Sequence, residues 1–163
     1  MNRLKPIVLV SACLLGQPVR YDGRSKPVNL TQLFDTFSFV AVCPECAGGL
    51  SIPRPPCEIE ETKTAADVLS GHGRIISQTG EDCTEAYIKG AQLCTKIAQT
   101  YQVNCALLKE NSPACGPHFI HSGRFDGRLK SGKGAFAELL SQMGIRIFSE
   151  QEINELIISM EKS

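Results

Sequence analysis

Eight cysteines are the residues of this sequence best suited to chemistry. They stand at positions 13, 43, 46, 57, 83, 94, 105 and 115 of a 163-residue chain. An even number of cysteines indicates disulfides in a short secreted protein, but a chain of this length can bury a sufficient core without them. In a cytoplasmic protein, clustered cysteines instead indicate metal binding, catalysis or simple burial.

Residues 7–16, IVLVSACLLG, help to decide whether the protein is secreted or cytoplasmic. Basic residues upstream and a small-residue stretch before Cys13 would suit a lipoprotein signal. The strongly apolar part, Ile7 to Ala12, is however shorter than the apolar region of a signal peptide, and Leu14 and Leu15 follow the would-be cleavage point. We therefore interpret the stretch as a buried strand that ends near Cys13, and we predict a cytoplasmic protein.

The charge balance bears on the class of partner. Lysine plus arginine and aspartate plus glutamate number 17 each, which gives no overall attraction to nucleic acid or to an anionic membrane surface. The apolar runs are far shorter than the roughly 20 residues of a membrane span. We expect a small-molecule ligand, with neither nucleic acid nor membrane as partner.

Four apolar runs predict the sheet that positions the cysteines. They cover residues 7–12, 39–43, 105–109 and 145–149. Continuous apolar character is typical of parallel strands that are covered on both faces. Helical patterns cover residues 82–102, 133–144 and 150–161, with a weaker one at 30–37. In the first, we expect Ala86, Leu93, Ile97 and Tyr101 to share the apolar face.

This alternation predicts an α/β fold. We expect one domain over residues 1–163, with a doubly wound, mostly parallel, Rossmann-like sheet. Residues 50–80 are rich in proline, glycine and charge. They predict a long irregular excursion after the second strand, with a small hairpin around residues 74–76.

The predicted strands bring three cysteines together. Cys13 ends the first strand, Cys43 ends the second, and Cys115 lies in the loop after the third. Loops at the carboxyl ends of parallel strands converge on the crevice where ligands bind. The cysteines at 83, 94 and 105 lie on a helix or inside a strand, and we expect them to be small buried hydrophobic residues.

Converging thiolates favour soft metals: zinc, copper(I) or an iron–sulfur cluster. A cluster bound by three cysteines leaves one iron with an open position, a Lewis acid toward substrate. The C-x-x-C pair Cys43 and Cys46 keeps two alternatives open. One is a zinc-stabilised binding or regulatory module that also uses two of Cys13, Cys57 and Cys115. The other is a thiol- or persulfide-handling protein, although the pair is followed by AGG in place of an evident helix.

Four segments resemble the 2-thiouracil desulfidase family. They are VSACLLGQPVRYDG (10–23), CPECAGGLSIPRPPCE (43–58), LLKENSPACG (107–116) and GRFDGRLKSGKGAFAELLSQMGIRIFSE (123–150). The resemblance implies a [4Fe-4S] cluster held by three cysteines, and non-redox conversion of a thiolated pyrimidine into the oxo-pyrimidine and hydrogen sulfide. A related thioamide or thiolated nucleoside is also a possible natural substrate.

The same resemblance implies roles for five residues. Cys13, Cys43 and Cys115 would be the cluster ligands, while Glu45 of the CPE triplet and Ser112 of the NSP triplet would be catalytic. Cys46 and Cys57 do not correspond to ligands of the family.

Weaker candidates flank these motifs. Arg20 and Tyr21 could contact substrate or hold their own loop, and Lys109 could pair with Glu110. Arg54 could shape the pocket wall. We expect the two histidines nearest Cys115, His118 and His121, to be surface residues, since a lone nearby histidine is more often exposed than a ligand.

Overall fold

A computed structural model describes residues 4–161, and a four-stranded parallel sheet forms its centre. The strands are β1 (Ile7–Ser11), β2 (Ser38–Val42), β5 (Cys105–Leu108) and β8 (Arg146–Ser149). Their order across the sheet is β2-β1-β5-β8, and every neighbouring pair is parallel. All four predicted strands are confirmed, each to within one residue at either end.

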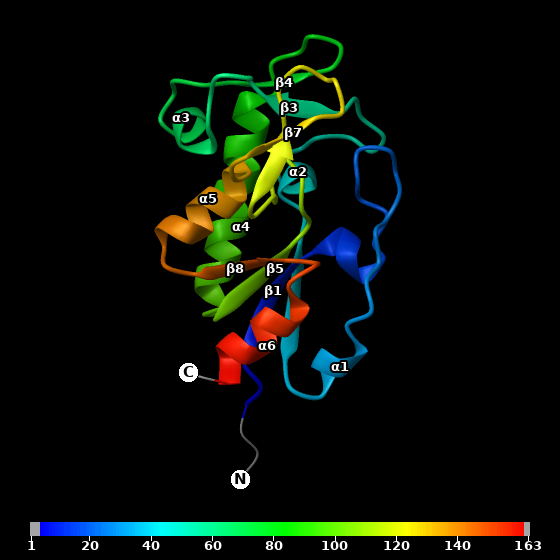
Figure 1. Cartoon of the computed structure of the whole chain (residues 1–163), viewed down its shortest axis with the longest axis vertical. Coiled ribbons are helices and arrows are strands. Elements are labelled where there is room, and N and C mark those ends of the chain that lie inside the picture. Colours follow the sequence, from blue (N-terminus) through cyan, green and yellow to red (C-terminus); the bar gives the residue numbers. More distant parts are fainter. Residues whose placement is uncertain (1–3, 162–163) are drawn as a thin grey trace.

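Helices cover both faces of this sheet (Figure 1). One core contains Leu9 and side chains of α4 (Thr84–Thr100) and α5 (Ala135–Gln142). The other core contains Val8 and Val10 with side chains of α1 (Thr31–Phe34) and α6 (Ile153–Glu161). Because successive residues of β1 enter different cores, the sheet is doubly wound, as the sequence predicts.

The buried face of α4 differs from the predicted one. Tyr87, Ala91, Cys94 and Ala98 are buried, whereas Leu93 and Tyr101 are exposed. Of the predicted face, Ile97 does pack against the core, where it is partly buried. The spacing of the buried residues is that of one helical face, but they are mostly small. The helix packs closely against its neighbours through small residues, and this is why an interpretation based on large apolar residues chose the wrong face.

The excursion after β2 contains more structure than the sequence predicts. Its elements are α2 (Pro44–Ala47), β3 (Cys57–Ile59), α3 (Ala65–Leu69) and β4 (Ile75–Ser77). The predicted hairpin is confirmed as the antiparallel pair β3–β4. The helix α2 begins directly after Cys43 and contains Cys46, so the expectation that the C-x-x-C pair lacks a helix N-terminus was wrong.

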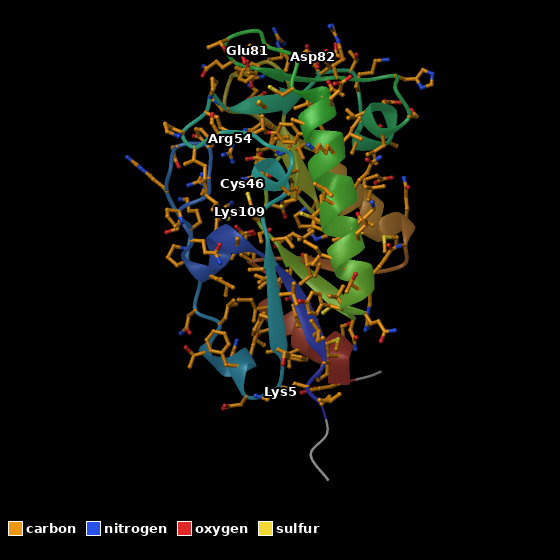
Figure 2. All side chains as sticks on the ribbon, turned by 180° about the vertical axis from the view of Figure 1, so that it is seen from behind. Lys5, Cys46, Arg54, Glu81, Asp82 and Lys109 are labelled. Carbon is orange, nitrogen blue, oxygen red and sulfur yellow. The ribbon has the colours of Figure 1, made fainter. Side chains whose placement is uncertain are left out.

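A second hairpin follows β5. It joins β6 (Phe119–His121) and β7 (Leu129–Ser131). The small strands lie at the end of the molecule away from the N-terminus and α1 (Figure 1). Figure 2 shows the molecule from behind, with Asp82 near one end and Lys5 near the other. Arg54 and Lys109 lie between these two ends.

Two of the cysteines expected to be inert are fully buried. Cys94 and Cys105 are 1% and 0% exposed, while Cys83 is partly exposed at the N-cap position of α4. Within residues 4–161, no helix combines the length and the apolar character needed to cross a membrane.

Candidate active site

A cavity of about 460 Å³ opens at the carboxyl edge of the parallel sheet. Cys13 after β1, Cys43 after β2 and Cys115 in the loop after β5 all line it. The strand order reverses between β1 and β5, which is where open α/β sheets bind their ligands. The predicted convergence of these three cysteines is confirmed. We call this space the cysteine cavity.

Short structured turns position the first two thiols. Cys13 lies in a one-turn 3-10 helix, Ala12–Leu15, which Gly16 ends in a left-handed conformation with φ of 93°. Cys43 is the N-cap residue of α2, and Pro44 occupies the first helical position, where its missing N–H costs nothing. Ser11 pairs with Val42 in the parallel register, so both thiols follow the sheet edge by one or two residues.

Two glycines let α2 pack directly on α4. A Cβ added to Gly48 would collide with the backbone carbonyl of Ala86, and one added to Gly90 would collide with that of Pro44. No other residue type fits this contact without displacing one helix. The close approach therefore fixes the position of α2 relative to α4. It thereby also fixes where Cys43 and Glu45 lie in the wall of the cysteine cavity.

The loop that carries Cys115 is held by a serine. The backbone N–H groups of Ala114 and Cys115 donate to Ser112 Oγ at 3.1 and 3.0 Å. At the adjoining sheet edge, the N–H of Lys109 donates to Ser11 Oγ at 3.0 Å. Ser112 thus has the turn role typical of serine before proline, and it also lines the cysteine cavity.

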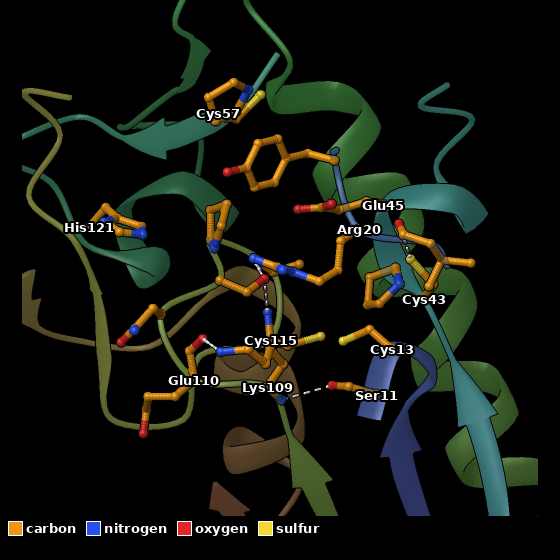
Figure 3. Close-up of a pocket in the computed structure, with 18 of the residues that line it drawn as sticks. Ser11, Cys13, Arg20, Cys43, Glu45, Cys57, Lys109, Glu110, Cys115 and His121 are labelled. Carbon is orange, nitrogen blue, oxygen red and sulfur yellow. Dashed lines mark hydrogen bonds between the residues drawn. The ribbon is translucent and has the colours of Figure 1, made fainter. Parts of the chain in front are cut away.

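Two of the three thiols are shielded from water, and the third, Cys43, is half-buried. Cys13 is 7% exposed and Cys115 6% exposed, and Figure 3 shows their sulfurs turned toward each other. Burial raises the pKa of Cys43 to about 12 and raises the pKa of Cys115 well above its usual range. Burial also raises the pKa of Cys13, against the opposing charges of Lys109 and Arg20. Binding of a metal at these sulfurs must therefore displace protons.

Glu45 occupies the cavity wall next to these thiols, and its carboxylate is firmly held. Arg54, whose side chain is 4% exposed, pairs with Glu45 Oε2. The hydroxyl of Tyr87 donates to Glu45 Oε1 at 2.7 Å. Burial, followed by the nearby Glu45 charge, raises the pKa of Tyr87 well above its usual range. Tyr87 therefore remains a hydrogen-bond donor, and the two partners fix the orientation of the carboxylate.

Arg54 also connects two loops through hydrogen bonds, a role that the sequence did not indicate. It donates to the carbonyl oxygens of Ser51 and Val19 at 3.0 and 2.9 Å. It thereby joins the loop after β1 to the loop after α2 behind the cavity wall.

The remaining charged residues of this region are mostly paired. Lys109 Nζ lies 3.0 Å from Glu150 Oε2, so its ionic partner is Glu150 and not its neighbour Glu110. The Glu110 carboxylate instead accepts the backbone N–H groups of His118 and Phe119, both at 2.9 Å. Arg20 lines the cavity and has a weak contact, 4.0 Å, with an aspartate of its own loop.

The other cysteines and histidines separate into two groups. Cys57 and His121 line the cysteine cavity, whereas Cys46 and His118 do not. His118 is exposed and pairs with Glu152, so it is a surface residue, as expected. His121 is half-buried at the end of β6, so the expectation of a surface position was wrong for it. Its strand is three residues long and gives no periodic signal that could have placed it.

The zinc alternative has no geometric support. Among the side chains of residues 4–161, no three of histidine, cysteine, aspartate or glutamate lie close enough together to hold one metal ion.

Comparison with known proteins agrees with this geometry. The profile of a family described as 2-thiouracil desulfurase matches residues 8–152. The uncharacterized protein YbbK of Bacillus subtilis (strain 168) is 41% identical over 152 residues, which cover 93% of this chain and all of that protein. A solved structure of TudS (DUF523Vcz), a [4Fe-4S]-dependent thiouracil desulfidase, matches with a TM-score of 0.85 and 38% identity over 98% of this chain and all of that chain. The chain therefore belongs to the 2-thiouracil desulfurase family.

Proposed function

We propose that this protein is a [4Fe-4S]-dependent desulfidase acting on thiolated pyrimidines such as 2-thiouracil. Water replaces the thiocarbonyl sulfur, and the products are the oxo-pyrimidine and hydrogen sulfide, with no net oxidation or reduction. Family membership and the match to TudS support this activity. The observation that carries it is the convergence of three cysteine thiols with Glu45 and Ser112 in one cavity.

The donor set of the cavity fits an iron–sulfur cluster. Cys13, Cys43 and Cys115 offer soft sulfur ligands, and we assign them as the three cluster ligands. A cluster of four irons is larger than a single ion, so its cysteines need not be close enough to share one metal. When bound, such a cluster supplies an iron with an open position, which acts as a Lewis acid toward a thiocarbonyl sulfur.

Glu45 is our candidate for proton transfer. Arg54 and Tyr87 hold its two carboxylate oxygens at the cavity wall. Oε2 already accepts two N–H groups of Arg54, whereas Oε1 accepts only the Tyr87 hydroxyl and keeps a further lone pair. With that lone pair Glu45 can accept a proton from the attacking water and pass it to a ring nitrogen or to the departing sulfide. A carboxylate whose orientation is already fixed needs little rearrangement for this step.

Ser112 is our candidate for binding the pyrimidine ring. Its Oγ already accepts two backbone N–H groups. The hydroxyl proton remains available for donation into the cavity, to an acceptor atom of the ring. The same serine would thus hold the Cys115 loop and orient the substrate.

Anaerobic purification followed by metal and sulfide analysis tests the cofactor. We expect a brown protein with about four iron atoms and as many acid-labile sulfides per chain, and release of hydrogen sulfide from 2-thiouracil. A colourless protein with one tightly bound zinc would overturn the proposal.

A matched pair of variants tests the ligand assignment. Cys43→Ser should lose iron, whereas Cys46→Ser, which changes a thiol three residues away and outside the cavity lining, should retain it. The reverse result would show that we chose the wrong ligands. Glu45→Gln should keep its iron and lose turnover by about 100-fold or more, the usual contribution of a positioned acid or base; full activity would exclude the proton-transfer role.

A further inference from the structure

His121 lines the cysteine cavity and has a buried ring nitrogen without a hydrogen-bond partner. Within residues 4–161, its Nδ1 is the buried side-chain nitrogen or oxygen that has none. Buried polar atoms in native proteins are nearly always satisfied, and an exception calls for a specific explanation. The cavity offers one, because His121 lines it.

The strand that carries His121 is held rigidly at both ends. Before it, the buried carboxylate of Glu110 accepts the N–H groups of His118 and Phe119. After it, the buried carboxylate of Glu58 accepts the N–H groups of Gly123 and Phe125, at 2.8 and 3.1 Å. Two buried carboxylates therefore fix the backbone around His121 before any ligand arrives. Such support is typical of a preorganised binding residue.

The unpaired Nδ1 determines where the proton of the neutral ring resides. An imidazole carries one N–H and one bare nitrogen. A buried N–H without an acceptor is the costlier of the two to leave unpaired. We therefore assign the proton to Nε2, and Nε2–H is then the donor that a ligand in the cavity can accept from.

The same observation excludes two other roles for His121. A histidine that binds metal almost always donates its second ring nitrogen to a protein acceptor. A general base is likewise oriented by a third group. The ring of His121 has neither partner among the described residues, so it is suited to hydrogen bonding with a ligand.

His121 also lies on the appropriate side of the cavity. Figure 3 shows it away from Cys13 and Cys43, on the opposite side of the view. A pyrimidine whose sulfur is directed toward the cysteines turns its remaining ring atoms toward this side. An exocyclic oxygen there is an acceptor for Nε2–H.

We propose that His121 is a specificity-determining residue that donates a hydrogen bond to the exocyclic oxygen of an oxo-thiopyrimidine. This inference rests on the proposed desulfidase activity and names the feature of the substrate that the enzyme selects. Thiopyrimidines without that oxygen should be poorer substrates.

The test compares two substrates that differ by this oxygen, 2-thiouracil and pyrimidine-2-thione. In the cluster-loaded wild-type protein, kcat/KM should favour 2-thiouracil. His121→Phe should reduce this preference about tenfold, the effect of one hydrogen bond, mainly through KM. His121→Gln should restore most of it, because the glutamine amide nitrogen can replace Nε2. A preference that is unchanged in His121→Phe would overturn the inference.

A control variant and a binding measurement complete the test. His118→Phe changes an exposed histidine outside the cavity lining, and it should leave the preference at the wild-type value. Calorimetric titration with uracil should show about tenfold weaker binding to His121→Phe than to the wild-type protein. Equal uracil affinities would also overturn the inference. A wild-type protein that contains iron but releases no sulfide would refute the proposed function, and the uracil titration would still decide the role of His121.

Discussion

Replacing Arg54 with methionine removes the guanidinium that holds Glu45, and the structure sets the size of the effect. The Arg54 and Glu45 side chains are 4% and 14% exposed. Breaking a buried ion pair by removing one partner costs about 3–5 kcal/mol. Glu45 keeps the Tyr87 hydroxyl at 2.7 Å and some contact with water, so we expect the lower end, about 3 kcal/mol.

Urea and thermal unfolding measure this loss. In a protein of this size, about 3 kcal/mol corresponds to a fall in melting temperature of roughly 6–12 °C. The control is Arg124→Met, which breaks an exposed pair with Glu61 at 3.7 Å and should cost at most about 1 kcal/mol. All variants are compared at equal iron content, because a bound cofactor shifts apparent stability.

A double-mutant cycle with Glu45→Gln separates the ion pair from the other bonds of Arg54. If the pair is coupled as the geometry indicates, the double variant should be more stable than the sum of the single losses predicts, by about 2 kcal/mol. Strictly additive losses, or a loss for Arg54→Met no larger than that for Arg124→Met, would refute the reasoning.

Three further changes test other parts of the fold. Gly90→Ala places a Cβ against the carbonyl of Pro44 and should cost about 1–3 kcal/mol in urea unfolding; unchanged stability would mean that α2 does not pack directly on α4. Hydrogen bonds from the Thr64 backbone and hydroxyl lower the pKa of Asp67 below its usual 3.8, so its stabilisation is complete above that pH and is lost as the pH falls through the lower folded-state value. The melting temperatures of Asp67→Asn and wild type should accordingly differ at neutral pH and converge in acid, and a constant difference would contradict this. Lys130 donates to three backbone carbonyls, at residues 60, 61 and 63; Lys130→Met should cost about 2 kcal/mol in urea unfolding, and a loss within error would show that these bonds do not stabilise the fold.

The parallel sheet was predictable because its signal is local. Each strand is a continuous apolar run, and the helices between the runs are long enough to cross over. The carboxyl-end rule then places Cys13, Cys43 and Cys115 at one edge without any knowledge of side-chain contacts. One element of the excursion also had a local signal that was missed, since Thr64-x-x-Asp67 forms the capping box of α3.

The supporting contacts of the site were not predictable in this way. Tyr87 and Arg54 reach Glu45 across 42 and 9 positions of sequence, and no spacing rule encodes either contact. The contact of Gly48 with Gly90 has the same character. In the sequence, AGG suggests a loop, whereas in the structure the missing side chain allows two helices to touch.

The proposals for this cavity depend on which polar groups already have hydrogen-bond partners within the protein (committed groups) and which still have unused hydrogen-bonding capacity (free groups). Internal partners already occupy the carboxylates of Glu45, Glu58 and Glu110, through an arginine, a tyrosine and pairs of backbone N–H groups. Oε1 of Glu45, the Ser112 hydroxyl proton and the His121 ring nevertheless keep hydrogen-bonding capacity that the described residues do not use. Committed groups fix the shape of a site, while free groups are the ones that a ligand can satisfy. If the substrate binds as proposed, Ser112 and His121 should therefore gain a hydrogen-bond partner on binding, whereas the carboxylates of Glu58 and Glu110 should keep the partners they have.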